Sequence, residues 1–340
     1  MRTIHLLAAL PLAGLFAGQA FAQACNKPLA LVDEIQMESA NGGPSTVPVK
    51  INGKDQKLTL ATAGTTTQLS EDAAKALNLE PTRSDMVLTD ALGNPNRVDE
   101  VAIADFSMGR LHGTNVKWPV TPEGGRGGRG GRGGGGGAGL FSLNYMRLYD
   151  VDVDFGSDKL RLFSQDHCPG AVLYWKAPGA VGTVPMTIDN GRVTVPVMLN
   201  GKAITGVIDT AAPNSTVYEA VAERVLGVTL GGDKAPADQP SKSPPGKTYS
   251  WTVDSLAIGT LALNNVAIGV RPDINANQGK DPAQTMRARA SAIQAELAHP
   301  EVKLGMDVLR KLHLYMAFGE NKLYVTGTTA ALPAEAAKAP

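Results

Sequence analysis

The sequence has few aromatic residues, few cysteines and no excess of either charge. Aromatic residues make up 5% of its 340 residues, whereas Gly (38) and Pro (22) are abundant. This composition is typical of short strands and turns rather than of a helical bundle. Lys plus Arg equals Asp plus Glu at 32 each, so the charge does not indicate a nucleic-acid or acidic partner. The five histidines show no metal-ligand spacing, and we expect no cofactor and no metal.

The chain also lacks an apolar run long enough to cross a membrane. Arg2 precedes a mostly apolar run over residues 4–17, and Ala20-Phe21-Ala22 is a small-x-small cleavage site. This pattern predicts a signal peptide over residues 1–22, and therefore a periplasmic or secreted protein. A lipid anchor on Cys25 is the less favoured alternative, because the residues before Cys25 are a poor lead-in for lipidation.

Only two cysteines are present, Cys25 and Cys168. In an exported chain such a pair is most simply one disulfide, and two free thiols are the alternative. Closing a loop of this size contributes about 4–5 kcal/mol in the chain-entropy treatment. A catalytic role for Cys168 is disfavoured, because only His167 lies beside it in the sequence.

One pattern of strand, tight turn and apolar strand occurs twice. Residues 195–202 predict a strand that ends in an Asn-Gly turn, and an apolar run then leads to Asp209-Thr210-Ala211-Ala212. At an offset of 148 residues, 47–54 aligns with 195–202 without a gap, and Ala61-Thr62-Ala63 aligns with 209–211. The main difference is that Ala61 stands where the second copy has Asp209.

Further elements repeat in the same order. A helix is predicted after each apolar strand, over about 70–77 with Ser70 as N-cap and over about 217–225. A closing element follows near 140–155 and again near 304–319, with Ser142 in the first copy where the second has Gly305. Residues 26–45 form a polar lead-in to the first copy, and a helix is predicted over 281–297.

The hairpin that ends in Asp209-Thr210-Ala211 resembles the active-site hairpin of aspartic proteases, and more specifically that of the retropepsin-like proteases of bacteria. The family pattern is Asp-Thr-Gly-Ala, from which Ala211 departs. The resemblance implies an all-β fold with two homologous acid-protease-like β-barrel lobes and a few short helices. We expect the first lobe over 23–169, with a Gly-rich insert at 124–137, the second lobe over 170–328, and a disordered tail over 329–340. The resemblance also implies flap segments near 90–94 and 232–247.

In this family, two carboxylates share one proton and activate one water. The resemblance makes Asp209 one catalytic carboxylate, with Thr62 and Thr210 as a locking pair, and it puts Ala61 at the position of the lost second Asp. A methyl group cannot hold a water or take a proton. The Cβ of Ala211, where the family has Gly, strains the backbone if φ at this residue is positive and has no such cost otherwise.

Two other acids are candidates for a replacement carboxylate. Asp307 is more simply explained as a turn and helix cap, and Asp90 as a residue that stabilises a flap turn.

Three functions stay open. The first is peptide-bond hydrolysis by an exported aspartic protease, impaired by Ala61 unless two chains pair through Asp209. The second is a pseudoprotease that binds polypeptide in the interlobe cleft without cutting it. The third is a β scaffold in which Asp209 only caps a turn. We expect a monomer rather than a homodimer, no membrane span and no nucleic acid. The Arg-Gly-Gly repeats in 124–137 are interpreted as a flexible insert rather than a nucleic-acid segment, because no aromatic residues are interleaved.

Overall fold

The structure, a computed structural model, describes residues 25–39, 42–89, 95–121, 137–189, 191–228, 237–238, 248–271 and 301–328. Several predicted segments lie outside the described residues: the signal peptide, nearly all of the Gly-rich insert, the turn at 90–94, most of 232–247, the helix over 281–297 and the tail over 329–340. Within the described ranges, no helix has both the length and the apolar character needed to span a bilayer.

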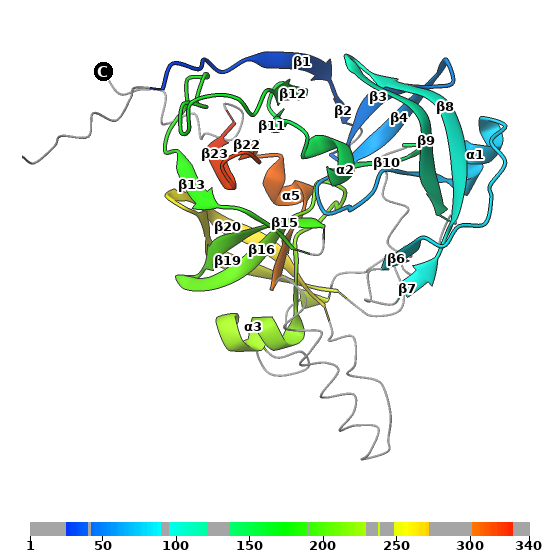
Figure 1. Cartoon of the computed structure of the whole chain (residues 1–340). Coiled ribbons are helices and arrows are strands. Elements are labelled where there is room, and N and C mark those ends of the chain that lie inside the picture. Colours follow the sequence, from blue (N-terminus) through cyan, green and yellow to red (C-terminus); the bar gives the residue numbers. More distant parts are fainter. Residues whose placement is uncertain are drawn as a thin grey trace, which may run out of the picture.

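The described residues are mostly strand (Figure 1). The strands are β1 (Leu31–Gln36), β2 (Glu38–Ser39), β3 (Ser45–Ile51), β4 (Lys54–Ala61), β5 (Gln68–Ser70), β6 (Val87–Thr89), β7 (Pro95–Arg97), β8 (Asp99–Met108), β9 (Leu111–Thr121), β10 (Gly139–Ser142), β11 (Asp150–Asp154), β12 (Lys159–Phe163), β13 (Gly182–Pro185), β14 (Thr187–Asp189), β15 (Arg192–Leu199), β16 (Lys202–Ile208), β17 (Thr216–Tyr218), β18 (Ala237–Asp238), β19 (Tyr249–Ile258), β20 (Leu261–Arg271), β21 (Val302–Leu304), β22 (Leu312–Ala317) and β23 (Lys322–Gly327). The helices are α1 (Glu71–Ala76), α2 (Leu143–Met146), α3 (Glu219–Leu226) and α5 (Met306–Leu309).

The first lobe is a closed barrel with the strand order β3-β4-β10-β5-β9-β8, and pairing of β3 with β8 closes it. The predicted hairpin β3–β4 turns at Asn52-Gly53, where φ is 49° and 76°. Positive φ at both central residues is what a type I′ hairpin turn needs, and Asn and Gly adopt it most readily. Ser70 caps α1 as predicted, since its hydroxyl accepts the N–H of Ala73 at 3.2 Å.

The second lobe repeats this barrel with the order β15-β16-β21-β17-β20-β19, closed by the pairing of β15 with β19. Its hairpin turn, Asn200-Gly201, has φ of 46° and 77°. The parallel pairs also correspond, because Ile208 lies opposite Leu304 between β16 and β21, as Leu60 lies opposite Phe141 between β4 and β10. The predicted fold of two homologous β-barrel lobes is therefore confirmed.

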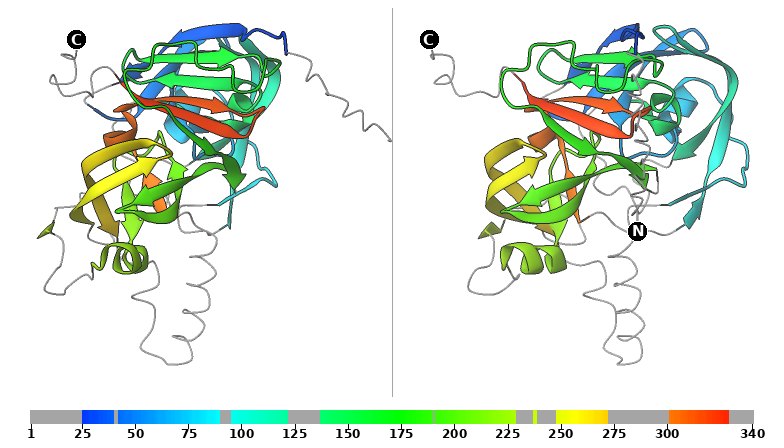
Figure 2. Two further views of the ribbon diagram at one scale, coloured as in Figure 1. Left: turned by 90° about the vertical axis from the view of Figure 1, so that its left-hand side faces the viewer. Right: turned by 60° about the vertical axis from the view of Figure 1, so that its left-hand side comes forward.

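A six-stranded sheet joins the two lobes, with the order β1-β12-β11-β22-β23-β13. The final hairpins of the two lobes meet in it, since β11 pairs with β22 and Val153 lies opposite Leu314. Figure 2 shows the green strands β11 and β12 beside the red strands β22 and β23. The sequence predicted both hairpins but not their union. Residues 26–45 are mostly polar as predicted, but they are not only a lead-in, because β1 pairs with β12 and buries Ile35.

The predicted disulfide is present. Cys25 and Cys168 are joined, with an S–S distance of 2.07 Å and a Cα–Cα distance of 5.6 Å. It ties the start of the described chain to the segment that follows β12, at one side of the six-stranded sheet. A disulfide between these cysteines fits an extracellular or periplasmic protein.

Candidate active site

The two lobes meet through a reciprocal set of hydrogen bonds between Thr62 and Thr210. The N–H of Thr62 donates to Oγ1 of Thr210 at 3.1 Å, and the N–H of Thr210 donates to Oγ1 of Thr62 at 3.2 Å. Each hydroxyl then donates across the junction at 2.6 Å, Thr62 to the carbonyl of Ile208 and Thr210 to that of Leu60. Both threonines are fully buried. This network fixes the residues that precede the threonines, 61 and 209, on the two sides of the lobe junction.

The two sides of the junction carry different chemistry. Ala61 presents only a methyl group and is 1% exposed. Asp209 keeps a carboxylate whose side chain is 12% exposed. Its Oδ1 accepts the N–H of Ala211 at 3.1 Å, and its Oδ2 lies 3.5 Å from Nζ of Lys303. The acid at this site therefore has a cation beside it and a methyl group at the equivalent position of the other lobe.

Sequence reasoning missed Lys303. Its neighbours Val302 and Leu304 point into the barrel core and are fully buried, so the alternation of a strand turns Lys303 the opposite way. An apolar-Lys-apolar run before Gly305 was therefore a usable signal. The pairing with Asp209 needed one more fact, the parallel register between β16 and β21, which the sequence does not contain.

The loops behind the site are supported in the same way in both lobes. The carboxylate of Asp307 accepts the N–H of Ser215 at 2.8 Å and its hydroxyl at 2.6 Å. In the first lobe, Oδ1 of Asn144 accepts the N–H of Thr67 at 2.9 Å and its hydroxyl at 2.8 Å. Asp307 also accepts the N–H of Val308 at 2.9 Å. It therefore holds the loop at Ser215, as the turn interpretation expects, but it does not cap α5, because the N-cap residue is Gly305 and no side chain caps this helix.

Two small residues decide how closely these loops pack. A Cβ on Gly305 would lie 2.4 Å from the backbone carbon of Asn214, so only glycine fits, as expected for a strand beside this loop. The first lobe has Ser142 there and makes room with Gly64, where a Cβ would lie 2.5 Å from Oγ of Ser142. That hydroxyl is buried and has no partner among the described residues. Ala211 has no positive φ, so its Cβ is harmless.

Two histidine–carboxylate pairs are buried in the six-stranded sheet rather than at the lobe junction. Nε2 of His313 lies 2.7 Å from Asp152, and Nε2 of His167 lies 2.7 Å from Asp150. Nδ1 of His167 lies 3.0 Å from the carbonyl oxygen of Cys168, so an imidazolium donates to both acceptors. Burial opposes this charge, but the hydrogen bonds to Asp150 and Cys168 outweigh it and raise the pKa of His167. Each pair joins β11 to a histidine outside that strand, away from the candidate site.

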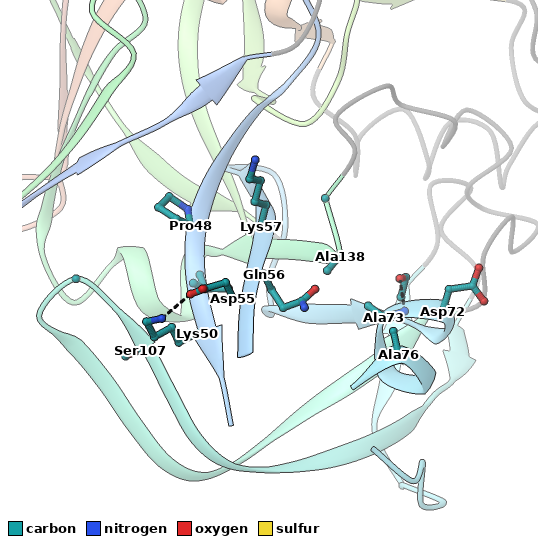
Figure 3. A pocket seen from close by; sticks show the side chains of 14 residues that line it. Pro48, Lys50, Asp55, Gln56, Lys57, Asp72, Ala73, Ala76, Ser107 and Ala138 are labelled. Carbon is teal, nitrogen blue, oxygen red and sulfur yellow. Dashed lines mark hydrogen bonds and ion pairs between the residues drawn. The ribbon is translucent and has the colours of Figure 1, made fainter. Parts of the chain in front are cut away.

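A hollow of about 810 Å³ lies elsewhere, on the first lobe between β3, β4 and α1 (Figure 3). Lys50 and Asp55 form an ion pair of 2.5 Å in it. None of its lining residues belongs to the loops that carry Thr62 and Thr210, so it is not part of the candidate site. Asp90, the other candidate acid, lies outside the described residues.

Two solved structures and one sequence-family model are similar to this chain. The chain is similar to the aspartic proteinase from Irpex lacteus, with 11% identity and a TM-score of 0.48 over 88% of this chain and 98% of that one. It is also similar to conglutin gamma, a unique basic 7S globulin from lupine seeds, with 9% identity and a TM-score of 0.49 over 88% and 95%. No curated protein sequence matches significantly. A sequence model described as aspartyl protease matches residues 47–144 and 195–308, which together exceed half of the chain. The chain therefore belongs to the aspartyl protease family.

Proposed function

We propose that this protein binds an extended polypeptide at the junction of its lobes and does not cut it by the paired-aspartate reaction. One observation carries the proposal: Asp209 has Ala61 as its counterpart in the other lobe and Lys303 as its ion-pair partner. In this proposal Asp209 contacts the ligand, and the Thr62–Thr210 hydrogen bonds hold the site together.

The paired reaction depends on like charges. Two adjacent carboxylates cannot both ionise easily, so one keeps a proton to donate while the other takes a proton from water. Ala61 supplies no oxygen atom. Lys303 balances the charge of Asp209 instead of repelling it. The arrangement therefore lacks the proton shared between acid and base on which this reaction depends.

Binding needs less than catalysis. The junction keeps partly exposed side chains on both lobes, including Ala63, Leu140, Ala211 and Lys303. An extended peptide recognised by main-chain hydrogen bonds and by alternate side chains needs a surface of this kind and no second acid. The family to which the chain belongs acts on polypeptides, which makes a polypeptide the ligand that we propose.

We further propose that the protein is exported after removal of residues 1–22 and acts as a monomer in the periplasm or outside the cell. The Cys25–Cys168 disulfide supports this, because such bonds persist in oxidising compartments. Sequencing of the mature N-terminus tests the removal of residues 1–22, and gel filtration tests the monomeric state.

The decisive experiment compares wild type with Asp209→Asn on a peptide library at acid and neutral pH, with and without pepstatin. We expect no cleavage by either protein, and retention of a subset of peptides in native gel filtration. Cleavage that Asp209→Asn abolishes refutes the non-catalytic half of the proposal and shows that a second carboxylate comes from elsewhere. A library that passes through without retention refutes the binding half.

A further inference from the structure

Lys303 in the second lobe and Leu140 in the first lobe occupy equivalent positions beside the candidate site, and one is charged whereas the other is apolar. In β21, Lys303 lies opposite Val207 on one side and Thr216 on the other. In β10, Leu140 lies opposite Thr59 and Gln68, the residues that correspond to Val207 and Thr216 in the repeat. The same position therefore carries a cation in the second lobe and an aliphatic side chain in the first.

Lys303 retains unused hydrogen-bonding capacity. Its side chain is 36% exposed and its ammonium carries three N–H donors. The 3.5 Å distance to Asp209 is an ion-pair contact, and within the described chain no acceptor lies at hydrogen-bond distance from Nζ in a suitable geometry. Asp209, by contrast, is already held by the N–H of Ala211. A further anion can therefore approach Nζ without dismantling the site.

Leu140 offers the complementary surface. Leu140 is half-buried. Its neighbours in the strand are Gly139, which has no side chain, and Phe141, which is buried in the core. Residue 142 of this strand lies opposite Ala61, just as the chain beyond Lys303 runs beside Asp209. An apolar ligand side chain placed against Leu140 therefore contacts an aliphatic group at the position where the second lobe offers the ammonium of Lys303.

We propose that Lys303 and Leu140 determine ligand specificity: the bound polypeptide places an acidic side chain against Lys303 and an apolar side chain against Leu140. This inference rests on the proposed function and names the class of ligand. A basic ligand side chain against Lys303 is disfavoured, because the two cations repel each other. Since Lys303 is partly exposed, replacing the ligand's acid by its amide should weaken binding about tenfold or less.

The test uses an unbiased library of 12-residue peptides captured by the full mature protein. The peptides recovered should be enriched in Asp or Glu at one position relative to an apolar residue. The best of them is resynthesised with Glu→Gln or Asp→Asn, and both forms are titrated against wild type and Lys303→Met by fluorescence anisotropy. Wild type should prefer the acidic form about five- to tenfold, and Lys303→Met should lose this preference or reverse it, because the carboxylate of Asp209 remains. Lys303→Glu should favour a peptide with Lys at that position.

Lys202→Met is the matched control, because Lys202 lies in the same lobe and its Nζ donates to the carbonyl of Arg224, away from the junction. It should keep the wild-type preference, and Lys303→Arg should keep most of it even if Lys303→Met folds poorly. If wild type retains no peptide, the proposed function itself fails. If peptides bind without acidic enrichment, or the preference survives in Lys303→Met, this inference fails and the proposed function stands.

Discussion

Replacing Ala61 by Asp is the most direct test of the geometry of the lobe junction. Ala61 is 1% exposed and directly precedes Thr62, whose hydrogen bonds with Thr210 hold Asp209 on the opposite side. A carboxylate introduced at residue 61 would therefore lie next to Asp209 and nearly out of water. At a separation of about 4 Å and an effective dielectric constant of about 20, two carboxylates repel by about 4 kcal/mol.

This repulsion gives the variant a distinctive pH dependence. The folded variant relieves it by keeping one proton, so the pKa of the carboxylate pair lies above the unfolded value of about 3.9. A carboxyl pKa raised by folding costs stability as the pH rises above the unfolded value. From about pH 4 to pH 7, Ala61→Asp should therefore lose up to about 4 kcal/mol more than the uncharged Ala61→Asn. The cation of Lys303 reduces the difference, and adding Lys303→Met should restore it.

The assay is urea unfolding of both variants at a series of pH values. Adding Asp209→Asn to Ala61→Asp should remove the pH-dependent part, since it removes the second charge. If Ala61→Asp and Ala61→Asn follow parallel curves between pH 4 and 7, residues 61 and 209 are not neighbours and the account of the junction is wrong. Digestion of a peptide library by Ala61→Asp then asks separately whether a restored pair of carboxylates cuts.

Three further perturbations have expected outcomes. Thr210→Val leaves a buried carbonyl and a buried N–H unpaired across the lobe junction. It should lower the unfolding free energy by about 2–4 kcal/mol in chemical denaturation. A loss below about 0.5 kcal/mol contradicts the hydrogen-bond network. Cys25→Ser removes the bond to Cys168 and should cost about 4–5 kcal/mol, read from unfolding with and without reductant; equal stabilities in the two conditions for wild type contradict this. Burial opposes the charge of His167, but its hydrogen bond to Asp150 outweighs that and raises the pKa, so the stabilisation is complete below about pH 6.5 and is lost as the pH rises through the raised value. The stability gap between wild type and His167→Gln should therefore shrink towards alkaline pH, and a constant gap contradicts the assignment.

The parts of the fold that were predictable from the sequence are those that local chemistry determines. Asn-Gly at the same offset in both repeats predicted both hairpins, because few other residues tolerate positive φ at two successive positions. Ser70 followed by acids predicted a helix start. Two cysteines in a chain with an apparent leader allowed only one pairing within the chain.

The parts that were not predictable depend on register and on contacts between the lobes. The sequence shows that β11 and β22 are strands, but their pairing across nearly half of the chain follows from how the two barrels face each other. The role of Lys303 was hidden for the same reason, since Asp209 and Lys303 meet only when β16 and β21 pair in parallel. The sequence pattern showed that residue 61 lacks a carboxylate. Only the arrangement of strands shows that Lys303 lies beside Asp209.

The Thr62–Thr210 network does not by itself argue for catalysis. Each threonine is fully buried and satisfies polar groups of both lobes, so its loss would leave orphaned groups whatever the protein does. Loss of a carboxylate at residue 61 stabilises the fold instead. It removes a repulsion between two like charges and leaves a small apolar group in a buried place. Folding stability alone therefore preserves the threonines and favours Ala61. Asp209 is different: its side chain is 12% exposed, one of its oxygens accepts a single backbone N–H, and the other is paired with a lysine that is itself 36% exposed. Folding stability explains the Thr62–Thr210 network but not the Asp209–Lys303 pair. A ligand should therefore be sought at Asp209 and Lys303.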